Sequence, residues 1–227
     1  MNDIHVLPVR GIPEIETGDD LGRIICDALA DLVVAQDVVV VAQKIVSKAE
    51  GRRVPAADRR DAAIAESAQI LRRAGDMIIS ETRHGFVCAN AGVDASNVPR
   101  DEVLLLPVDP DLSARRIRGA IERRLGTPVG VVVADTFGRA WRLGQTNVAI
   151  GIAGFDPFVD YRGRLDASGR ELTATRICVA DEIAAAAEMV MGKTSDIPVA
   201  IVRGAPVSWG RGSARAIVRP HGEDLFR

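Results

Sequence analysis

Asp37-Val-Val-Val-Val-Ala-Gln43 is the stretch that decides the fold of this 227-residue chain. Its apolar run is nearly uninterrupted, whereas a strand with one face in water alternates apolar and polar residues. The stretch therefore predicts a central β-strand that is covered on both faces. Short β-branched runs elsewhere alternate with alanine- and arginine-rich helical stretches, which indicates a mixed α and β protein.

Other strands and helices are predicted on both sides of this stretch. The expected strands cover residues 4–9, 103–108, 129–133, 172–179 and 198–202. The expected helices follow Gly18-Asp19-Asp20 and cover residues 56–75, 112–125 and 181–191. Because no fixed repeat and no change of composition marks a boundary, we expect one domain over residues 1–227, with a division into two lobes left open.

The composition is that of a globular protein, with 47% hydrophobic and 26% charged residues. The formal net charge of −2 gives no overall field that would attract a nucleic acid or an anionic membrane. The apolar runs are too short to span a bilayer. The cysteines are odd in number, widely spaced and without a nearby histidine, so a zinc site and a disulfide framework are not indicated. We expect a cytoplasmic protein that binds neither nucleic acid nor membrane.

Two small-residue segments present an aspartate beside hydroxyl, amide and glycine groups. Asp94 lies in Asn90–Asn97, and Asp135 is followed by Thr136 after an apolar run. Hard cations such as Mg²⁺ prefer oxygen ligands, so two carboxylates from separate segments can hold such an ion against phosphates. An aspartate after a strand is also a common turn or N-cap residue. Two such segments in one chain favour a metal and phosphate site.

A basic segment directly follows the central apolar stretch. Gln43, Lys44 and Lys48 lie where open sheets tend to place ligand contacts. On a helix the two lysines share a face, and like charges at that spacing repel unless an anion bridges them. The alternative is an ordinary basic helix.

Common nucleotide and hydrolase motifs are absent from the sequence. Gly192-Lys193-Thr194 resembles part of a P-loop, but Ala187 stands where that motif requires glycine, and the triplet is expected to end a helix. The glycine pattern of a Rossmann site and the Gly-x-Ser-x-Gly pattern of a serine hydrolase do not occur.

Several segments, taken together and in order, resemble the coenzyme F420 L-glutamate ligase (gamma-glutamyl ligase) family. They run from about Leu7 to about Phe226, which is nearly the whole chain. The segments are Gly11–Glu14, Gly18–Leu21, Ala42–Gly51, Ala91–Asn97, Ala134–Asn147, Val179–Glu182 and Val202–Gly204.

The resemblance implies an unusual α+β fold with mixed sheets and helices. It also implies a GTP-dependent ligase that adds L-glutamate to the F420 precursor and releases GDP and phosphate. Members of this family use Mg²⁺ or Mn²⁺, respond to K⁺ and form an intertwined homodimer. Some relatives carry a further C-terminal flavin-binding domain, and this chain is expected to be the ligase unit alone.

The resemblance also implies roles for individual residues. Asp94, Asp135 and Lys48 match catalytic positions, and Asp94, Asp135 and Thr136 match metal ligands. The nucleotide-binding positions are Ile12, Pro13, Glu14, Ile15, Gln43, Lys48, Asn97, Arg203 and Gly204. Gln43 stands where some relatives have serine, so its contact is expected to differ in detail.

These residues suit a reaction in which a carboxylate first takes the γ-phosphoryl group of GTP and the amine of glutamate then displaces phosphate. In phosphoryl transfer a protein mostly positions groups and neutralises charge. No residue is an obvious general base for the amine. Two alternatives stay open at this point: a ligase for another carboxylate, and a non-catalytic homologue that binds GTP and metal.

Overall fold

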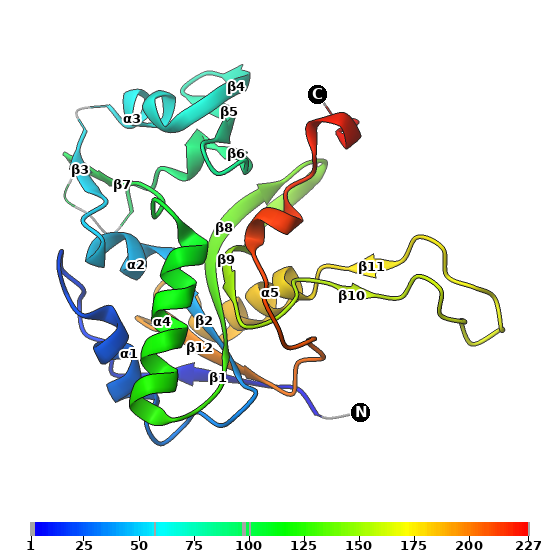
Figure 1. Cartoon of the computed structure of the whole chain (residues 1–227). Coiled ribbons are helices and arrows are strands. Elements are labelled where there is room, and N and C mark those ends of the chain that lie inside the picture. Colours follow the sequence, from blue (N-terminus) through cyan, green and yellow to red (C-terminus); the bar gives the residue numbers. More distant parts are fainter. Residues whose placement is uncertain (1–2, 57, 97–98, 100, 227) are drawn as a thin grey trace.

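The computed structural model describes residues 3–226 except 57, 97, 98 and 100, and a five-stranded sheet forms its centre (Figure 1). The strand order is β1-β12-β2-β8-β9, and only the β2–β8 pair of this sheet is parallel. Its strands are β1 (His5–Val9), β2 (Val38–Ala42), β8 (Gly130–Arg139), β9 (Arg142–Ala153) and β12 (Val199–Arg203). The α+β class with mixed sheets is confirmed.

Strand β2 lies in the middle of this sheet and is covered on both faces, as predicted. Val39 and Val41 face a core built with helices α1 (Leu21–Leu29) and α4 (Pro110–Leu125). Val38 and Val40 face a second core built with helix α5 (Val179–Met191). All four valines are wholly buried, so the uninterrupted apolar run reflects a helix layer on each side of the sheet.

Smaller sheets surround this central layer. A three-stranded sheet of order β4-β5-β6 packs with α3 and the 3-10 helix η1 over a small core of its own. Helix α2 follows β2 without a loop, and β3 pairs with β7 close by. The bounds are α2 (Gln43–Ala49), β3 (Arg53–Pro55), α3 (Arg59–Glu66), β4 (Ser67–Ala74), β5 (Met77–Thr82), β6 (Val87–Ala89), η1 (Asn90–Gly92) and β7 (Glu102–Leu104).

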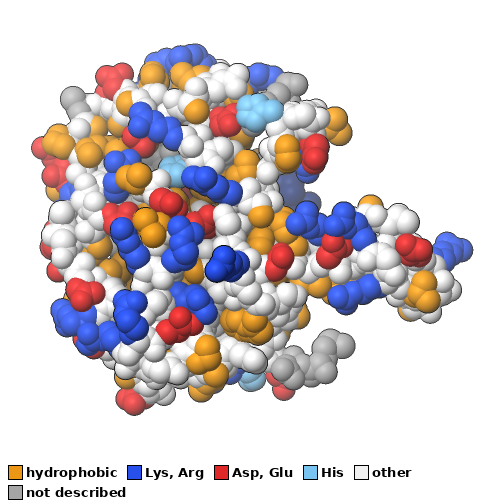
Figure 2. Space-filling model, viewed as in Figure 1, with side chains coloured by type: hydrophobic (Ala, Val, Ile, Leu, Met, Phe, Trp, Pro, Cys, Tyr) orange, Lys and Arg blue, Asp and Glu red, His pale blue; other side chains and the backbone are white. Residues whose placement is uncertain are grey.

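An arm projects from the body between β9 and α5. Its base is the hairpin of β10 (Val159–Asp160) and β11 (Arg176–Ile177), and it carries basic and acidic side chains along its length (Figure 2). The C-terminal segment then returns across the body through two short 3-10 helices, η2 (Ala214–Ile217) and η3 (His221–Glu223). Within the described residues, no helix has both the length and the apolar character needed to cross a membrane.

Three predicted elements differ from the structure. The helix expected over residues 56–75 ends at Glu66, and residues 67–74 form strand β4 instead. The strands expected over 103–108 and 172–179 are reduced to β7 and β11. The long strand β9 was not predicted, because its glycines weaken the strand pattern. Gly151 is required there, since a Cβ atom would lie 2.2 Å from the Pro110 carbonyl oxygen at the start of α4.

Candidate functional site

A pocket of about 470 Å³ opens at the carboxyl end of strand β2, beside the middle of strand β8. The two strands are parallel and their pairing ends with Ala42 opposite Ala134, so the next residues, Gln43 and Asp135, come to the same place. The segment Ile12–Glu14 and the C-terminal end of α5 with the loop that follows it complete the walls. This is the edge at which open sheets commonly bind ligands.

Gln43 presents an unused hydrogen-bond donor in this pocket. It is buried, and its Oε1 accepts a 2.8 Å hydrogen bond from Ser47 Oγ. Its Nε2 has no hydrogen-bond partner among the described residues. Because an unsatisfied buried donor costs free energy, the amide is placed to donate to a ligand oxygen.

All three lysines of the chain line this pocket. They are three of 29 lysines and arginines in the sequence, and arginine carries the positive charge everywhere else. Lysine concentrates its charge on a compact ammonium with three donors, whereas arginine spreads it over a planar fork. The concentration of Lys44, Lys48 and Lys193 around one cavity therefore indicates a site for a compact polyanion such as a chain of phosphates.

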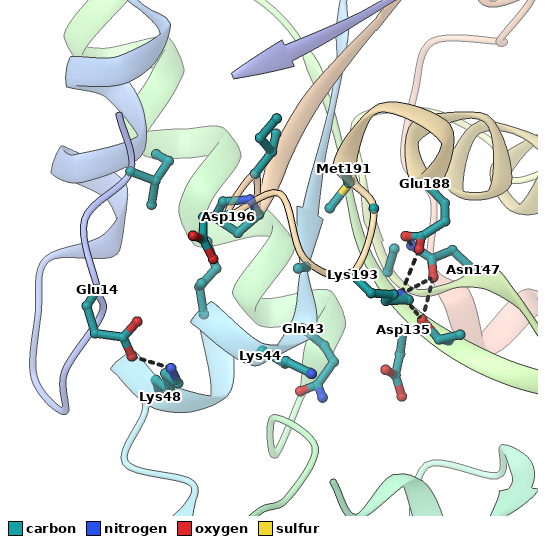
Figure 3. Close-up of a pocket in the computed structure, with 18 of the residues that line it drawn as sticks. Glu14, Gln43, Lys44, Lys48, Asp135, Asn147, Glu188, Met191, Lys193 and Asp196 are labelled. Atoms are coloured by element: carbon teal, nitrogen blue, oxygen red, sulfur yellow. Dashed lines mark hydrogen bonds and ion pairs between the residues drawn. The ribbon is translucent and has the colours of Figure 1, made fainter. Parts of the chain in front are cut away.

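Each ammonium has an acidic partner, as Figure 3 shows for two of them. Lys48, which is buried, pairs with the exposed carboxylate of Glu14. Lys44 Nζ lies 2.9 Å from Asp94 Oδ2. These pairs hold the positive charges at the pocket wall, and a stronger anion can displace the exposed Glu14 partner.

Lys193 is held by a separate cluster on the other side of the pocket (Figure 3). Its Nζ lies 2.8 Å from Glu188 Oε1 and donates to Thr136 Oγ1 at 2.6 Å. Asn147 joins the cluster, because it accepts from Thr136 at 2.6 Å and donates to Glu188 at 2.8 Å. More than half of the Lys193 side chain is exposed, so it can move toward a ligand without breaking the core.

The pKa values of the two predicted metal-binding carboxylates are shifted in opposite directions. Burial alone would raise the pKa of Asp94, but hydrogen bonds from the Ser96 amide and from Lys44 outweigh it and hold that pKa below its usual value. Burial raises the pKa of Asp135 to about 7, against a lowering by the Thr136 amide and with a further increase from the nearby charge of Asp94. A cation beside both carboxylates would favour the ionised form of each.

The residues present fit a hard divalent cation that takes only a few of its ligands from the protein. No group of three or more His, Cys, Asp or Glu side chains within the described ranges is arranged to hold a metal ion. Mg²⁺, however, is commonly bound by one or two carboxylates together with waters and substrate phosphates. Asp94 and Asp135 next to a lysine-lined pocket match that pattern, and Thr136 contributes a hydroxyl to the same wall.

The structure brings together most of the residues predicted for the nucleotide. Ile12, Pro13, Glu14, Gln43 and Lys48 line the pocket. Ile15 instead packs in the core beside α1 and lies outside the pocket lining. Asn97 lies outside the described residues.

Arg203 and Gly204 lie at the opposite end of the sheet. Strand β12 runs antiparallel to β2 with Val199 opposite Val41, so Arg203 comes close to the start of β2. Its guanidinium forms two 2.9 Å hydrogen bonds with the buried carboxylate of Asp37. Within this chain the pair joins the ends of two strands, and the structure does not bring Arg203 to the pocket.

Lys193, Glu188 and Asn147 line the pocket although their sequence context does not predict it. The sequence of Gly192-Lys193-Thr194 predicts the end of a helix, and Gly192 does occupy the C-cap of α5. The cap position does not exclude a ligand-binding role for the next side chain. The scarcity of lysine was the available signal, because a residue type used three times in 227 positions is expected to serve a specific purpose.

Comparison with known proteins relates this chain to one family of ligases. The sequence model of a family described as F420-0:Gamma-glutamyl ligase matches residues 11–65 and 56–204. The chain is 40% identical to the coenzyme F420:L-glutamate ligase of Methanothermobacter thermautotrophicus, over 99% of each chain. It is also 40% identical to that of Archaeoglobus fulgidus, over 99% of this chain and 96% of the relative.

Proposed function

The chain belongs to the F420-0:gamma-glutamyl ligase family, and we propose that it uses GTP to join L-glutamate to the F420 precursor. The family and its relatives make the protein a coenzyme F420:L-glutamate ligase of F420 biosynthesis. The nucleotide, the cations, the residue roles and the order of the steps are the proposal. The observation that carries it is the position of all three lysines around one pocket beside Asp94 and Asp135.

The reaction needs an activated carboxylate, because a carboxylate and an amine do not condense at neutral pH. An oxygen of the precursor's carboxylate attacks the γ-phosphorus of GTP, and the bond from that phosphorus to GDP breaks. The amine of glutamate then attacks the carbonyl carbon of the acyl phosphate and phosphate leaves, while the amine loses a proton. No residue of this chain is assigned as the base that receives that proton.

In this reaction the chain mainly binds phosphates and neutralises charge. Lys48, Lys44 and Lys193 surround the cavity, so their ammonium groups would hold the phosphates and offset the charge that develops during transfer. The Gln43 amide would donate to a phosphate or ribose oxygen. Asp94 and Asp135, with Thr136, would hold Mg²⁺ or Mn²⁺, which supplies further neutralisation of phosphate charge.

A K⁺ ion is also part of the proposal. The oxygens of Thr136, Asn147 and Glu188 gather around the Lys193 ammonium, so this wall already binds one monovalent cationic group. If Lys193 moves toward phosphate, the same oxygens are left for another monovalent cation.

The test of the function is mass spectrometry of the product formed from the F420 precursor, GTP, glutamate and Mg²⁺ or Mn²⁺. We expect the mass of the precursor to increase by one glutamyl unit or more, with release of GDP and phosphate. A panel of other acids in place of the precursor tests whether the chain is a ligase for another carboxylate. A non-catalytic homologue would bind GTP but release no phosphate. Its binding would be measured as protection of the three lysines from acylation when GTP is present.

Replacing Lys48 by Ala should raise the KM for GTP by about tenfold to a hundredfold. A lost hydrogen bond to a charged group costs about 1.5–3 kcal/mol, and about 1.4 kcal/mol corresponds to a factor of ten. The KM for glutamate should change much less, and initial-rate kinetics with each substrate varied in turn measures both. Equal increases in both values would show that Lys48 acts structurally through Glu14. Lys48→Arg is the matched variant, and we expect it to restore activity poorly because the site is shaped for an ammonium.

A homodimer is the proposed assembly, and its structural support is the projecting arm. A two-stranded hairpin has little stability alone, and Leu165 is 69% exposed on this arm. The aromatic side chains between residues 138 and 169 differ in exposure, and Phe155 is wholly buried in its own chain. Trp141 is 80% exposed.

Light scattering at micromolar concentration should therefore return about twice the mass of the chain. Leu165→Asp should shift that value toward the mass of one chain. Met189→Asp is the control, because Met189 is at least as exposed as Leu165 but lies on α5. A monomeric wild type that ligates glutamate would show that the second subunit is not needed.

A further inference from the structure

The side chain of Asp196 is a separate feature of the lysine-lined pocket. It lies in the loop after α5 and lines the pocket together with Glu14 and Glu188. Each of those two glutamates forms an ion pair with a lysine. The Asp196 carboxylate, by contrast, forms no hydrogen bond or ion pair with any residue that the structure describes. Because this carboxylate would repel phosphates, it suits a part of the ligand that offers hydrogen-bond donors.

The loop holds Asp196 between anchored neighbours. The hydroxyl of Ser195 donates to the carbonyl of Met191 at the end of α5. The carbonyl of Pro198 accepts a 2.8 Å hydrogen bond from the amide of the last residue of β2. Asp196 itself has a φ of +53°, in the left-handed region that Asp and Asn adopt more readily than most other residues. The carboxylate is therefore presented to the pocket from a defined position.

Asp196 lies away from the charged groups that suit phosphates. Figure 3 shows its carboxylate apart from both of the lysine ion pairs drawn there. The nearby lining is apolar, because Ile197 and Pro198 follow Asp196 directly and Met191 lies at the other end of its loop. An apolar wall with one polar group suits a nucleobase, which has apolar faces and a polar edge.

The donors and acceptors on the edge of the base decide which base fits a carboxylate. Guanine has two adjacent donors, N1–H and the 2-amino group, which match the two oxygens of a carboxylate. Adenine has an acceptor at N1 and no amino group at C2, so a carboxylate at the same place repels it. The hydroxyls of ribose also donate, but they occur with every base and do not distinguish one from another.

We infer that Asp196 selects guanine nucleotides by accepting hydrogen bonds from N1–H and the 2-amino group of the base. The inference rests on the proposed function, in which GTP is the phosphoryl donor. The lysines then hold the phosphates, and the base extends toward the loop after α5. Among the described residues, no group of three or more acids that could hold a metal includes Asp196. Its role is therefore separate from that proposed for Asp94 and Asp135.

Binding of nucleoside diphosphates in the presence of Mg²⁺ tests this role, because the reaction does not consume them. Isothermal titration calorimetry should show that the wild type binds GDP at least about tenfold more tightly than ADP. Asp196→Asn should weaken GDP binding by about tenfold to a hundredfold, the scale of a lost hydrogen bond to a charged group.

Xanthosine diphosphate gives a readout that a structural role of Asp196 would not change. Xanthine carries a carbonyl oxygen where guanine has the 2-amino group, so its edge presents one donor and one acceptor. The carboxamide of Asn offers the complementary acceptor and donor. Asp196→Asn should therefore bind xanthosine diphosphate about tenfold more tightly than the wild type does. Asn also adopts the left-handed conformation readily, so the loop should keep its shape.

Asp31→Asn is the matched control, because Asp31 is exposed in the turn after α1 and lies outside the pocket lining. Circular dichroism checks that both variants are folded. The inference is wrong if the wild type has no preference for GDP over ADP, or if Asp196→Asn keeps that preference. It is also wrong if the variant loses affinity for both equally, as a ribose contact would require.

The same data separate this inference from the proposed function. A preference for GDP that disappears in Asp196→Asn, in a protein whose wild type does not ligate glutamate, would support the role of Asp196 and refute the function. Ligation with GTP by the wild type, together with an unchanged preference in the variant, would refute the role of Asp196 alone.

Discussion

Replacement of Asp135 by Asn is expected to lower the rate of ligation by about a hundredfold or more and to leave the fold intact. Asn keeps the size of the side chain but removes the charge of one of the two carboxylates proposed to hold a divalent cation at this site. Loss of a single preorganised electrostatic group commonly costs two to three orders of magnitude in kcat, hence the estimate of about a hundredfold. Asp94→Asn should act in the same direction, and it also frees Lys44 from its ion pair.

The measurement is the rate of GDP release at limiting and at saturating Mg²⁺ or Mn²⁺. If Asp135 binds the cation, part of the lost rate should return as the metal concentration rises, whereas a loss of fold would not respond. Asp156→Asn is a matched control, because Asp156 is exposed and only caps a local turn. Wild-type turnover by Asp135→Asn at limiting metal would refute the assignment.

The stability of the same variant gives an independent readout. The pKa of Asp135 is raised from 3.8 to about 7, so the folded state holds this proton more tightly than the unfolded state. In protein freed of metal by a chelator, the free energy of unfolding of the wild type should therefore fall as the pH rises from about 4 to about 7. Asn does not ionise, so above pH 7 the variant should have the higher Tm. Added Mg²⁺ should raise the Tm of the wild type much more than that of the variant.

The central layer could be predicted from sequence because its signals are local. The valines of β2 and the capped ends of α1 and α4 each determine their structure within a few residues. Strand β4 could not be predicted in this way. Its sequence, Ser-Ala-Gln-Ile-Leu-Arg-Arg-Ala, favours a helix, and pairing with β5 along most of its length overrides that preference. Pairing with another strand cannot be recognised from the residues of β4 alone.

The site residues that come directly after an apolar run in the sequence could be predicted. Gln43 and Asp135 come after apolar runs that are parallel neighbours, so their meeting follows from the topology. Lys193 and Glu188 reach the same pocket from the C-terminal end of α5. No local sequence pattern indicates that this end of the helix lies beside β8. A second cavity, which is lined by several aromatic side chains, could not be predicted for the same reason. Phe86, Phe137 and Phe226 come from three separate parts of the chain, and only the folded structure brings them together.

The largest expected loss of stability follows from replacing Asp111 by Ala. Asp111 is buried in the first turn of α4, and its Oδ1 accepts hydrogen bonds from the amides of Ile152 at 2.8 Å and Ala214 at 2.9 Å. Its Oδ2 accepts from the Ser213 hydroxyl. One carboxylate thus joins a helix, the edge strand β9 and the C-terminal segment, and Ala would leave three donors without their acceptor.

We expect Asp111→Ala to lower the free energy of unfolding by about 3–5 kcal/mol, since hydrogen bonds to a charged group are worth about 1.5–3 kcal/mol each and are not additive. For a chain of this length that corresponds to a fall in Tm of about 6–20 °C. Asp109→Ala, which removes the N-cap bond to Leu112 and an exposed ion pair with Arg115, should cost about 1 kcal/mol. If Asp111→Ala lowers the free energy of unfolding no more than Asp109→Ala does, water replaces the carboxylate. The loss of unfolding free energy in Asp111→Asn should lie between the losses in Asp111→Ala and Asp109→Ala. Asn keeps one acceptor oxygen for the amides of β9 and the C-terminal segment.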